Sequence, residues 1–264
     1  MLPNPALEAE ELLGRAESRG TVVDLVKVVS LWPNLSVVEE DLEGAGYLLP
    51  IGEIGGTILV NRADKEERKR FTIAHELGHW VLGLAIKEAT GRFSQPKNAS
   101  YASIERWCDQ FATNLLMPES AIRASVAQRD PVVVLESVAS AAARFKVSQQ
   151  AFYLRIWEVL RFQVAILALS GSAGSREAHV ERGFGGDEAN KALENALRKT
   201  EIVEQLFAVP IVHFSLSSPA GKIKCLGRRQ GEGHLLLVLI WPTEGSTKSQ
   251  AQETQVHVTR EKVG

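Results

Sequence analysis

The sequence predicts an α+β protein with more than one domain. Two short helices, a β-rich stretch and two long helices fill the first 120 residues. A helical segment comes next, and strand signals then dominate to the end. A chain of 264 residues is long for one compact domain and comfortable for two or three. We therefore expect domains at residues 1–120, 121–161 and 162–264.

The composition is that of a globular protein. Hydrophobic residues make up 45% of the chain, and the formal net charge of −2 provides no global basic field to attract nucleic acid. The first twenty residues carry carboxylates where a signal peptide would be basic and apolar, and no apolar run is long enough to span a bilayer. We expect a cytoplasmic protein without a membrane partner.

The first domain is expected to open with two helices and three short strands. Apolar residues recur at helical spacing over residues 6–18 and 21–31. The β-branched and apolar runs LSVVEED, GAGYLLPIG and GGTILVN follow, with glycines between them. They predict a small antiparallel sheet. Its strand GGTILVN, expected at an edge, is a candidate to pair with an extended peptide.

Two further helices complete this domain. Helical periodicity covers residues 66–86, a polar loop is expected over residues 87–102, and a second helix runs from Ser103 to Met117. The second helix has one apolar stripe that we expect to face the core. It consists of Ile104, Trp107, Cys108, Phe111 and Leu115.

The first of these helices contains the motif His75-Glu76-Leu77-Gly78-His79, an H-E-x-x-H sequence. Residues four apart in a helix differ by about 40° around the axis and one turn in height, so both imidazoles can reach one cation. Glu76 lies beside that face, where it can act as general base without binding the metal. Three protein ligands and an open position are typical of a catalytic zinc site.

The third ligand must come from elsewhere in the chain. Metzincins have a third histidine six residues after the motif, but Leu82 and Ala85 occupy the positions that would continue that pattern. The candidate carboxylates are Glu88, Glu105, Asp109 and Glu119. Glu105 flanks the core-facing stripe of the second helix, and we predict it as the ligand. Asp109, one turn later, is expected to orient a histidine.

Other residues near these elements are weaker candidates. Tyr47 and Tyr101 are both able to stabilise an oxyanion, and the sequence does not choose between them. Cys108 and Cys225 are expected to be small core residues.

At these residues the sequence resembles the ImmA/IrrE family of metallopeptidases. The matching runs are GAGYLLPIGEIGGTILVNRADKEERKRFTIAHELGHWVLG and ERWCDQFATNLLMP. The resemblance implies a zincin-like fold, His75, His79 and Glu105 as metal ligands, and Glu76 as the catalytic residue. It implies zinc as the cofactor, with manganese as a possible ion in activity. Cys108 departs from the family, which often has alanine there.

The resemblance also implies a function. Members of the family cleave helix-turn-helix repressors of the XRE type, such as DdrO, and so induce stress or DNA-damage genes; others act on repressors of mobile elements. The order of the three expected domains is most similar to the radiation-response regulators of deinococci, whose tail is GAF-like. The alternative is a regulator that binds DNA or the repressor without cutting.

The second and third expected domains contain no chemical motif. Residues 131–160 form two predicted helices joined near Phe145, a helix-turn-helix layout. Arg155 is the only cation of the second helix, so direct DNA binding is not expected. In the third domain, five strand signals surround one helix near 187–207, with loops over 171–179 and 244–252. A GAF-like domain there would bind a small signal molecule.

Overall fold

The structure is a computed structural model of the chain. It describes residues 2–18, 20–52, 55–90, 92–97, 99–125, 131–160, 163–172, 175–183, 211–218, 221–230 and 234–240. The chain divides into two compact units, one formed by Met1–Ala127 with Val138–Arg155 and the other by Gln128–Ser137 with Ile156–Gly264. The division into three domains stays a prediction.

The first unit begins with the elements that surround the H-E-x-x-H motif. They are α1 (Pro5–Arg15), α2 (Leu25–Val29), β1 (Leu35–Glu40), β2 (Gly46–Ile51), β3 (Gly55–Asn61), α3 (Glu66–Thr90) and α4 (Tyr101–Leu116). Asn4 and Asp24 cap α1 and α2 by accepting hydrogen bonds from the first free backbone amides. The expected helix over 21–31 is shortened, and α3 continues four residues beyond the predicted end.

The three strands form a mixed sheet rather than the antiparallel sheet predicted. Their order is β1-β3-β2, with β1 parallel and β2 antiparallel to β3. The prediction failed because β1 and β3 are not joined by a hairpin: β2 lies between them in sequence but pairs on the far side of β3. GGTILVN is therefore the central strand, and the prediction that it is an edge strand was wrong.

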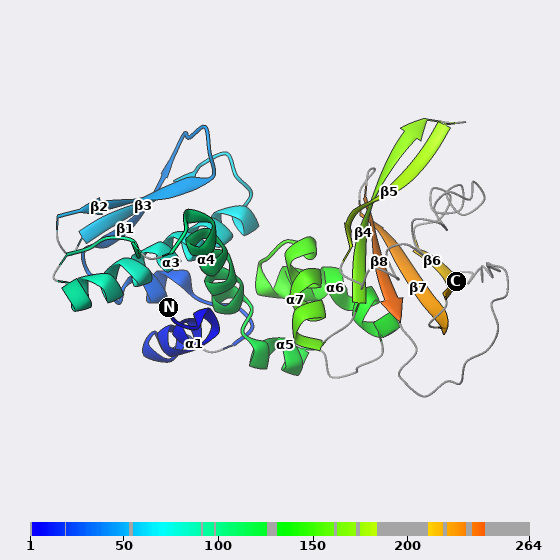
Figure 1. Cartoon of the computed structure of the whole chain (residues 1–264), viewed down its shortest axis with the longest axis horizontal. Helices are drawn as coiled ribbons and strands as arrows, with labels where there is room; N and C mark the ends of the chain where they lie inside the picture. The colour runs from blue at the N-terminus through cyan, green and yellow to red at the C-terminus, as the bar shows by residue number, and fades with distance from the viewer. Residues whose placement is uncertain are drawn as a thin grey trace. The chain divides into compact units, whose positions relative to one another are not determined.

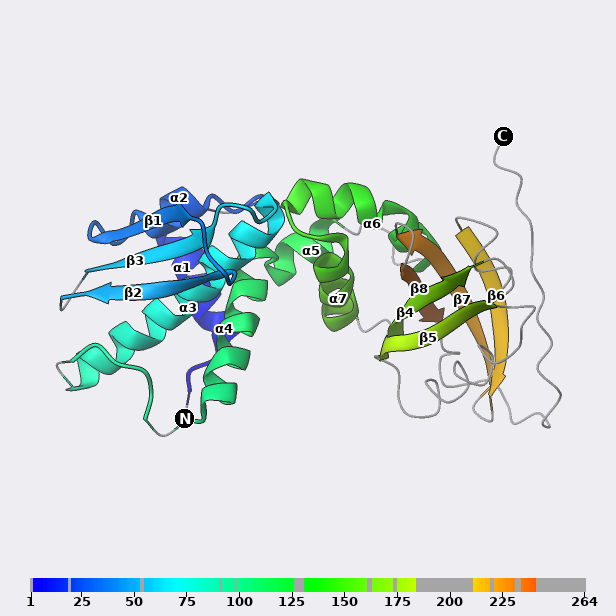
Figure 2. The same cartoon turned by 90° about the horizontal axis from the view of Figure 1, so that it is seen from above.

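The helices pack on one face of this sheet. Every second residue of β3 is buried, including Ile58 and Val60, and this face contacts α3. α4 packs against α3, and α1 packs against α4 (Figures 1 and 2). The predicted apolar stripe of α4 is confirmed, because all five of its residues are buried. Its burial fixes which face of α4 meets the helix that carries the histidines.

Three more helices follow: α5 (Glu119–Ser125), α6 (Pro131–Phe145) and α7 (Gln149–Leu160). The turn between α6 and α7 contains Lys146 with φ of 52°, a left-handed conformation, and confirms the expected junction of two helices. Phe145 and Phe152 pack together across this turn with ring centroids 5.3 Å apart.

Arg155, on α7, is buried rather than presented to solvent. Its side chain is 2% exposed, Nε donates to the Met117 carbonyl, and Nη2 donates to Oδ1 of Asn114. The guanidinium thus satisfies groups at the C-terminal end of α4. The one cation of this helix is not free to contact a phosphate.

We expect Arg155→Ala to lower the free energy of unfolding by about 2–4 kcal/mol, because buried acceptors lose their charged donor. Arg106→Ala is the matched control: this arginine is exposed, so the change should stay within about 0.5 kcal/mol. Urea denaturation measures both variants. Equal stabilities for the two would contradict the structural role of Arg155.

The second unit contains an antiparallel sheet. Its strands are β4 (Gln163–Ser172), β5 (Ser175–Gly183), β6 (Ile211–Ser218), β7 (Gly221–Gln230) and β8 (His234–Ile240), in the order β5-β4-β8-β7-β6. Four expected strands are confirmed. The loop expected over 171–179 is wrong in part, because most of it belongs to the β4–β5 hairpin.

Three further predictions for this region lie outside the described residues: the helix near 187–207, the loop over 244–252 and a strand at TQVHVT. Among the helices that the structure describes, none is both long and apolar enough to cross a membrane.

Candidate metal centre

His75 and His79 lie one turn apart on α3, with ring centroids 5.1 Å apart. Both side chains are largely buried, at 15% exposure each. The helix places them on one face because residues four apart in an α-helix lie above each other. The structure thus supplies the pair of imidazoles that the motif predicts.

Glu105 of α4 meets both histidines. Its Oε2 lies 3.3 Å from Nε2 of His75, and its Oε1 lies 3.3 Å from Nε2 of His79. These separations exceed the roughly 2.7–2.9 Å of a charge-assisted hydrogen bond. With one carboxylate oxygen toward each histidine, they are close to the roughly 3.3 Å between neighbouring ligand atoms around a tetrahedral ion with bonds of about 2.0–2.1 Å, as around zinc. The three side chains therefore fit a metal ion.

Asp109, one turn after Glu105, contacts the other nitrogen of the first histidine. Its Oδ1 lies 2.9 Å from Nδ1 of His75. With the proton on Nδ1, this nitrogen donates to Asp109, and Nε2 keeps its lone pair for a cation. Burial alone would lower the pKa of His75, but the hydrogen bond to Asp109 and the nearby carboxylates raise it above its usual value.

We expect Asp109→Asn to weaken zinc affinity or activity by about 10–100-fold, since a neutral amide accepts the Nδ1–H of His75 less strongly and orients the imidazole less well. Chelator competition measures the affinity. Gln110→Glu, at the exposed neighbouring position, is the control and should change it less than about twofold. An Asp109→Asn protein with wild-type affinity and activity would contradict the orienting role.

Glu76 is buried beside the histidines, at 8% exposure. Its carboxylate accepts a hydrogen bond from the backbone N–H of Leu48 on β2. Burial raises the pKa of Glu76 above its ordinary value, although His79, His75 and the Leu48 amide act in the opposite direction. A carboxylate with a raised pKa is better matched to proton transfer near neutral pH.

The hydrogen bond from Leu48 was not foreseen from the sequence. It follows from the antiparallel register of β2. The backbone N–H and C=O groups of Ala45 and of every second residue after it point to β3, whereas those of Leu48 point to the free edge. Pro50 fits this register, because an outward position needs no N–H for the sheet. Its position was the one signal in the sequence for the free edge beside Glu76.

The two tyrosine candidates differ in position. The phenol of Tyr101 donates a hydrogen bond to Glu105, and the charge of that carboxylate raises the pKa of the phenol. Tyr47 is paired with Leu59, whereas the side chains of Ile58 and Val60 face α3. By this register Tyr47 points to the opposite face of the sheet, so the structure brings Tyr101 to the site and Tyr47 away from it.

α3 and α4 approach each other closely at Gly78 and Cys108. A Cβ added to Gly78 would lie 3.1 Å from the Cα and 3.2 Å from the Sγ of Cys108. The absence of a side chain at Gly78 therefore permits the helix contact that brings Glu105 to the histidines. Burial and the surrounding carboxylates raise the pKa of the Cys108 thiol.

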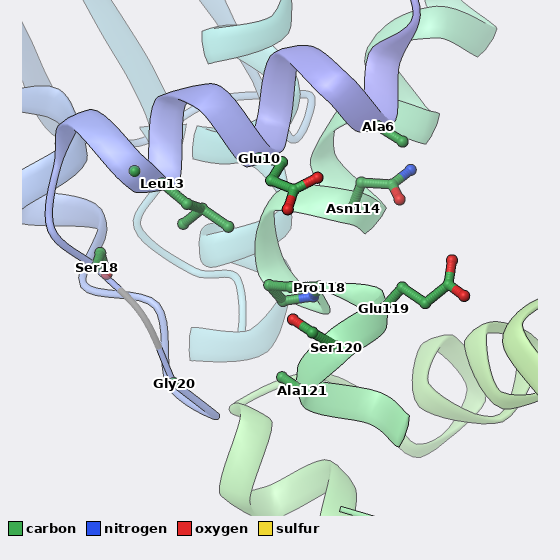
Figure 3. Close-up of a pocket in the computed structure, with 11 residues that line it drawn as sticks. Ala6, Glu10, Leu13, Ser18, Gly20, Asn114, Pro118, Glu119, Ser120 and Ala121 are labelled. Atoms are coloured by element: carbon green, nitrogen blue, oxygen red, sulfur yellow. The ribbon is translucent and has the colours of Figure 1, made fainter. Parts of the chain in front are cut away.

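The other carboxylates considered as third ligand lie elsewhere. Glu88 is exposed near the end of α3. Glu119, on α5, forms an ion pair of 2.7 Å with Arg123 and lines a cavity of about 460 Å³ between α1 and the α4–α5 junction (Figure 3). None of the residues that line this cavity belongs to the histidine site.

The described geometry is that of a metallopeptidase-type centre: an H-E-x-x-H helix, a carboxylate from a following helix and a buried glutamate. Residues 33–156 match the model of the Peptidase_M78 family, IrrE N-terminal-like domain, so this part of the chain is an IrrE-like peptidase domain. Among His, Cys, Asp and Glu side chains of the described residues, His75, His79 and Cys108 also group as a possible metal site.

Most of the chain also shares a fold with a solved structure. It is similar to a Mycobacterium tuberculosis transcriptional regulator at 15% identity and a TM-score of 0.53, over 90% of this chain and 76% of that chain. At this identity the likeness concerns the fold alone. No curated protein matches the sequence.

Proposed function

We propose that this protein is a metal-dependent endopeptidase that cuts a specific repressor protein. The observation that carries the proposal is the placement of Glu105 at 3.3 Å from both histidines, beside the buried Glu76. Zinc is the proposed ion, because two imidazoles and one carboxylate are a common ligand set of catalytic zinc. Manganese is the alternative, since the carboxylate ligand also suits it.

Each residue of the proposed centre has a separate role in the reaction. A divalent ion held by His75, His79 and Glu105 supplies Lewis-acid activation of water. Glu76 takes the proton of the attacking water and passes it to the leaving amine. The Leu48 amide holds the carboxylate of Glu76 in place. Tyr101, next to Glu105, is the proposed donor to the developing oxyanion.

We propose that the backbone of the substrate binds along the free edge of β2. On this edge the amide of Leu48 is engaged by Glu76 and Pro50 has no N–H, so the carbonyls of both residues are the groups available for pairing. An extended peptide would donate its own N–H groups to these carbonyls. Such pairing places a peptide bond beside Glu76.

The proposed substrate is an XRE-type helix-turn-helix repressor, DdrO-like, whose loss induces a DNA-damage or stress response. The IrrE-like domain supports this choice, and so does the fold shared with a transcriptional regulator. A GAF-like sensor role of the second unit, and the particular likeness to the deinococcal regulator IrrE, belong to the same proposal.

The test is to incubate the zinc-loaded protein with XRE-type repressors encoded near its gene and to identify fragments by mass spectrometry. We expect one discrete cut in one repressor and little cleavage of casein. If the repressor stays intact while the protein shifts promoter DNA or binds the repressor, the alternative of a regulator without proteolysis is correct. DNA binding by α7 is less well supported, because Arg155 is buried and donates to the Met117 carbonyl.

A further inference from the structure

Cys108 lies within the metal centre rather than merely near it. Its Sγ and one nitrogen from each of His75 and His79 lie within 4.8 Å of one another. The side chain is fully buried. Cys108 follows Glu105 by three residues on α4, so both side chains face α3 from the same side.

A second observation indicates why the sulfur can reach this position. Gly78 lies between the two histidines in sequence, and its missing side chain leaves Cys108 directly against α3. Around a tetrahedral zinc ion, sulfur and nitrogen ligands are separated by about 3.6 Å. A shift of at most about 1.2 Å would therefore bring Sγ to ligand distance, which is comparable to small movements of packed helices.

We propose that Cys108 is an additional ligand of this centre for thiophilic ions such as Zn²⁺ or Cd²⁺, whereas Mn²⁺ is held through Glu105. The inference rests on the proposed metal site. Thiolates bind soft ions strongly, and carboxylates suit hard ions. On binding, the S–H bond breaks, the proton leaves to solvent, and the sulfur electron pair forms the bond to the ion, so nothing is oxidised or reduced.

This arrangement has a consequence for activity. If Glu105 and Cys108 bind the same zinc ion together with both histidines, the attacking water would have to enter as a fifth ligand, an expansion that catalytic zinc sites allow. With Mn²⁺ held through Glu105 and the histidines alone, water would bind without this expansion.

The experiment is a titration of the full-length protein with cadmium chloride, followed by the ultraviolet absorption of cadmium–thiolate bonds. We expect a signal that saturates at about one ion per chain, is retained in Cys225→Ser and is lost in Cys108→Ser. Chelator competition should show zinc affinity about tenfold lower in Cys108→Ser and Mn²⁺ affinity changed less than about twofold. Cys108→Ala serves as a second variant, and circular dichroism checks folding.

The outcomes separate this inference from the proposed function. Metal binding that depends on His75 and His79, without any signal or affinity change that depends on Cys108, would overturn the inference alone. A cadmium–thiolate signal that survives His75→Ala with His79→Ala would also overturn it, because the sulfur would then bind outside the centre. No binding of zinc or manganese by the wild-type protein would overturn both.

Discussion

Replacing Glu76 with glutamine is expected to reduce cleavage of the repressor by about 10²–10⁴-fold while zinc remains bound. Glutamine has the same shape, and its amide oxygen can still accept the hydrogen bond from the Leu48 amide. It cannot accept the proton of the attacking water. Only the proton-transfer step is lost. Cleavage rates from gel densitometry and zinc content from atomic absorption measure the two effects separately.

Glu88→Gln is the matched control for this variant. Glu88 is an exposed acid on the same helix, so its neutralisation changes the charge of α3 without touching the centre. We expect wild-type cleavage from it. A Glu76→Gln protein that cuts within about tenfold of the wild-type rate would show that Glu76 is not the base.

The second large effect is expected for Glu105→Ala, which should weaken zinc binding by about 10²–10³-fold. The free energy of zinc binding to small structural sites is about 10–16 kcal/mol, which corresponds to roughly 3–4 kcal/mol for each ligand. Removal of this carboxylate also leaves the Nε2 atoms of His75 and His79 without their common partner. Competition with a chelator gives the affinity, and the thermal shift on adding zinc gives an independent measure.

Glu119→Ala is the control, because this carboxylate pairs with Arg123 on α5 and lies outside the centre. Its zinc affinity should equal that of the wild type. The reverse result, with weak binding only in Glu119→Ala, would move the third ligand to α5. If Cys108 binds soft ions, cadmium affinity should fall less than zinc affinity in Glu105→Ala.

Local sequence patterns anticipated much of the peptidase domain. The helical spacing of the H-E-x-x-H motif and the apolar stripe of α4 depend only on the 3.6-residue period, which is visible in the chain. Glu105 was chosen because it borders the stripe that must face the core, and the structure places it between the two histidines. Such inferences succeed because burial and periodicity are properties of one segment.

The features of the fold that the sequence did not predict depend on contacts between separate segments. The parallel pairing of β1 with β3 left β2 at the edge beside Glu76, and Pro50 of β2 was the one local signal for that order. The β4–β5 hairpin replaced an expected loop because strand pairing overrode the preference of a Gly- and Ser-rich stretch. The burial of Arg155 was not predicted, because its acceptors lie about forty residues earlier in the chain.

The sequence by itself determined that one helix carries two histidines and a glutamate on neighbouring positions, and that a later helix has a carboxylate at the border of its buried face. Only the tertiary structure decided that the Leu48 amide holds Glu76 and that the histidine contacted by Asp109 is His75. It also decided that Cys108 lies against Gly78 within reach of the same ion. The reason is that helix periodicity is local, whereas these contacts depend on how closely separate elements approach each other.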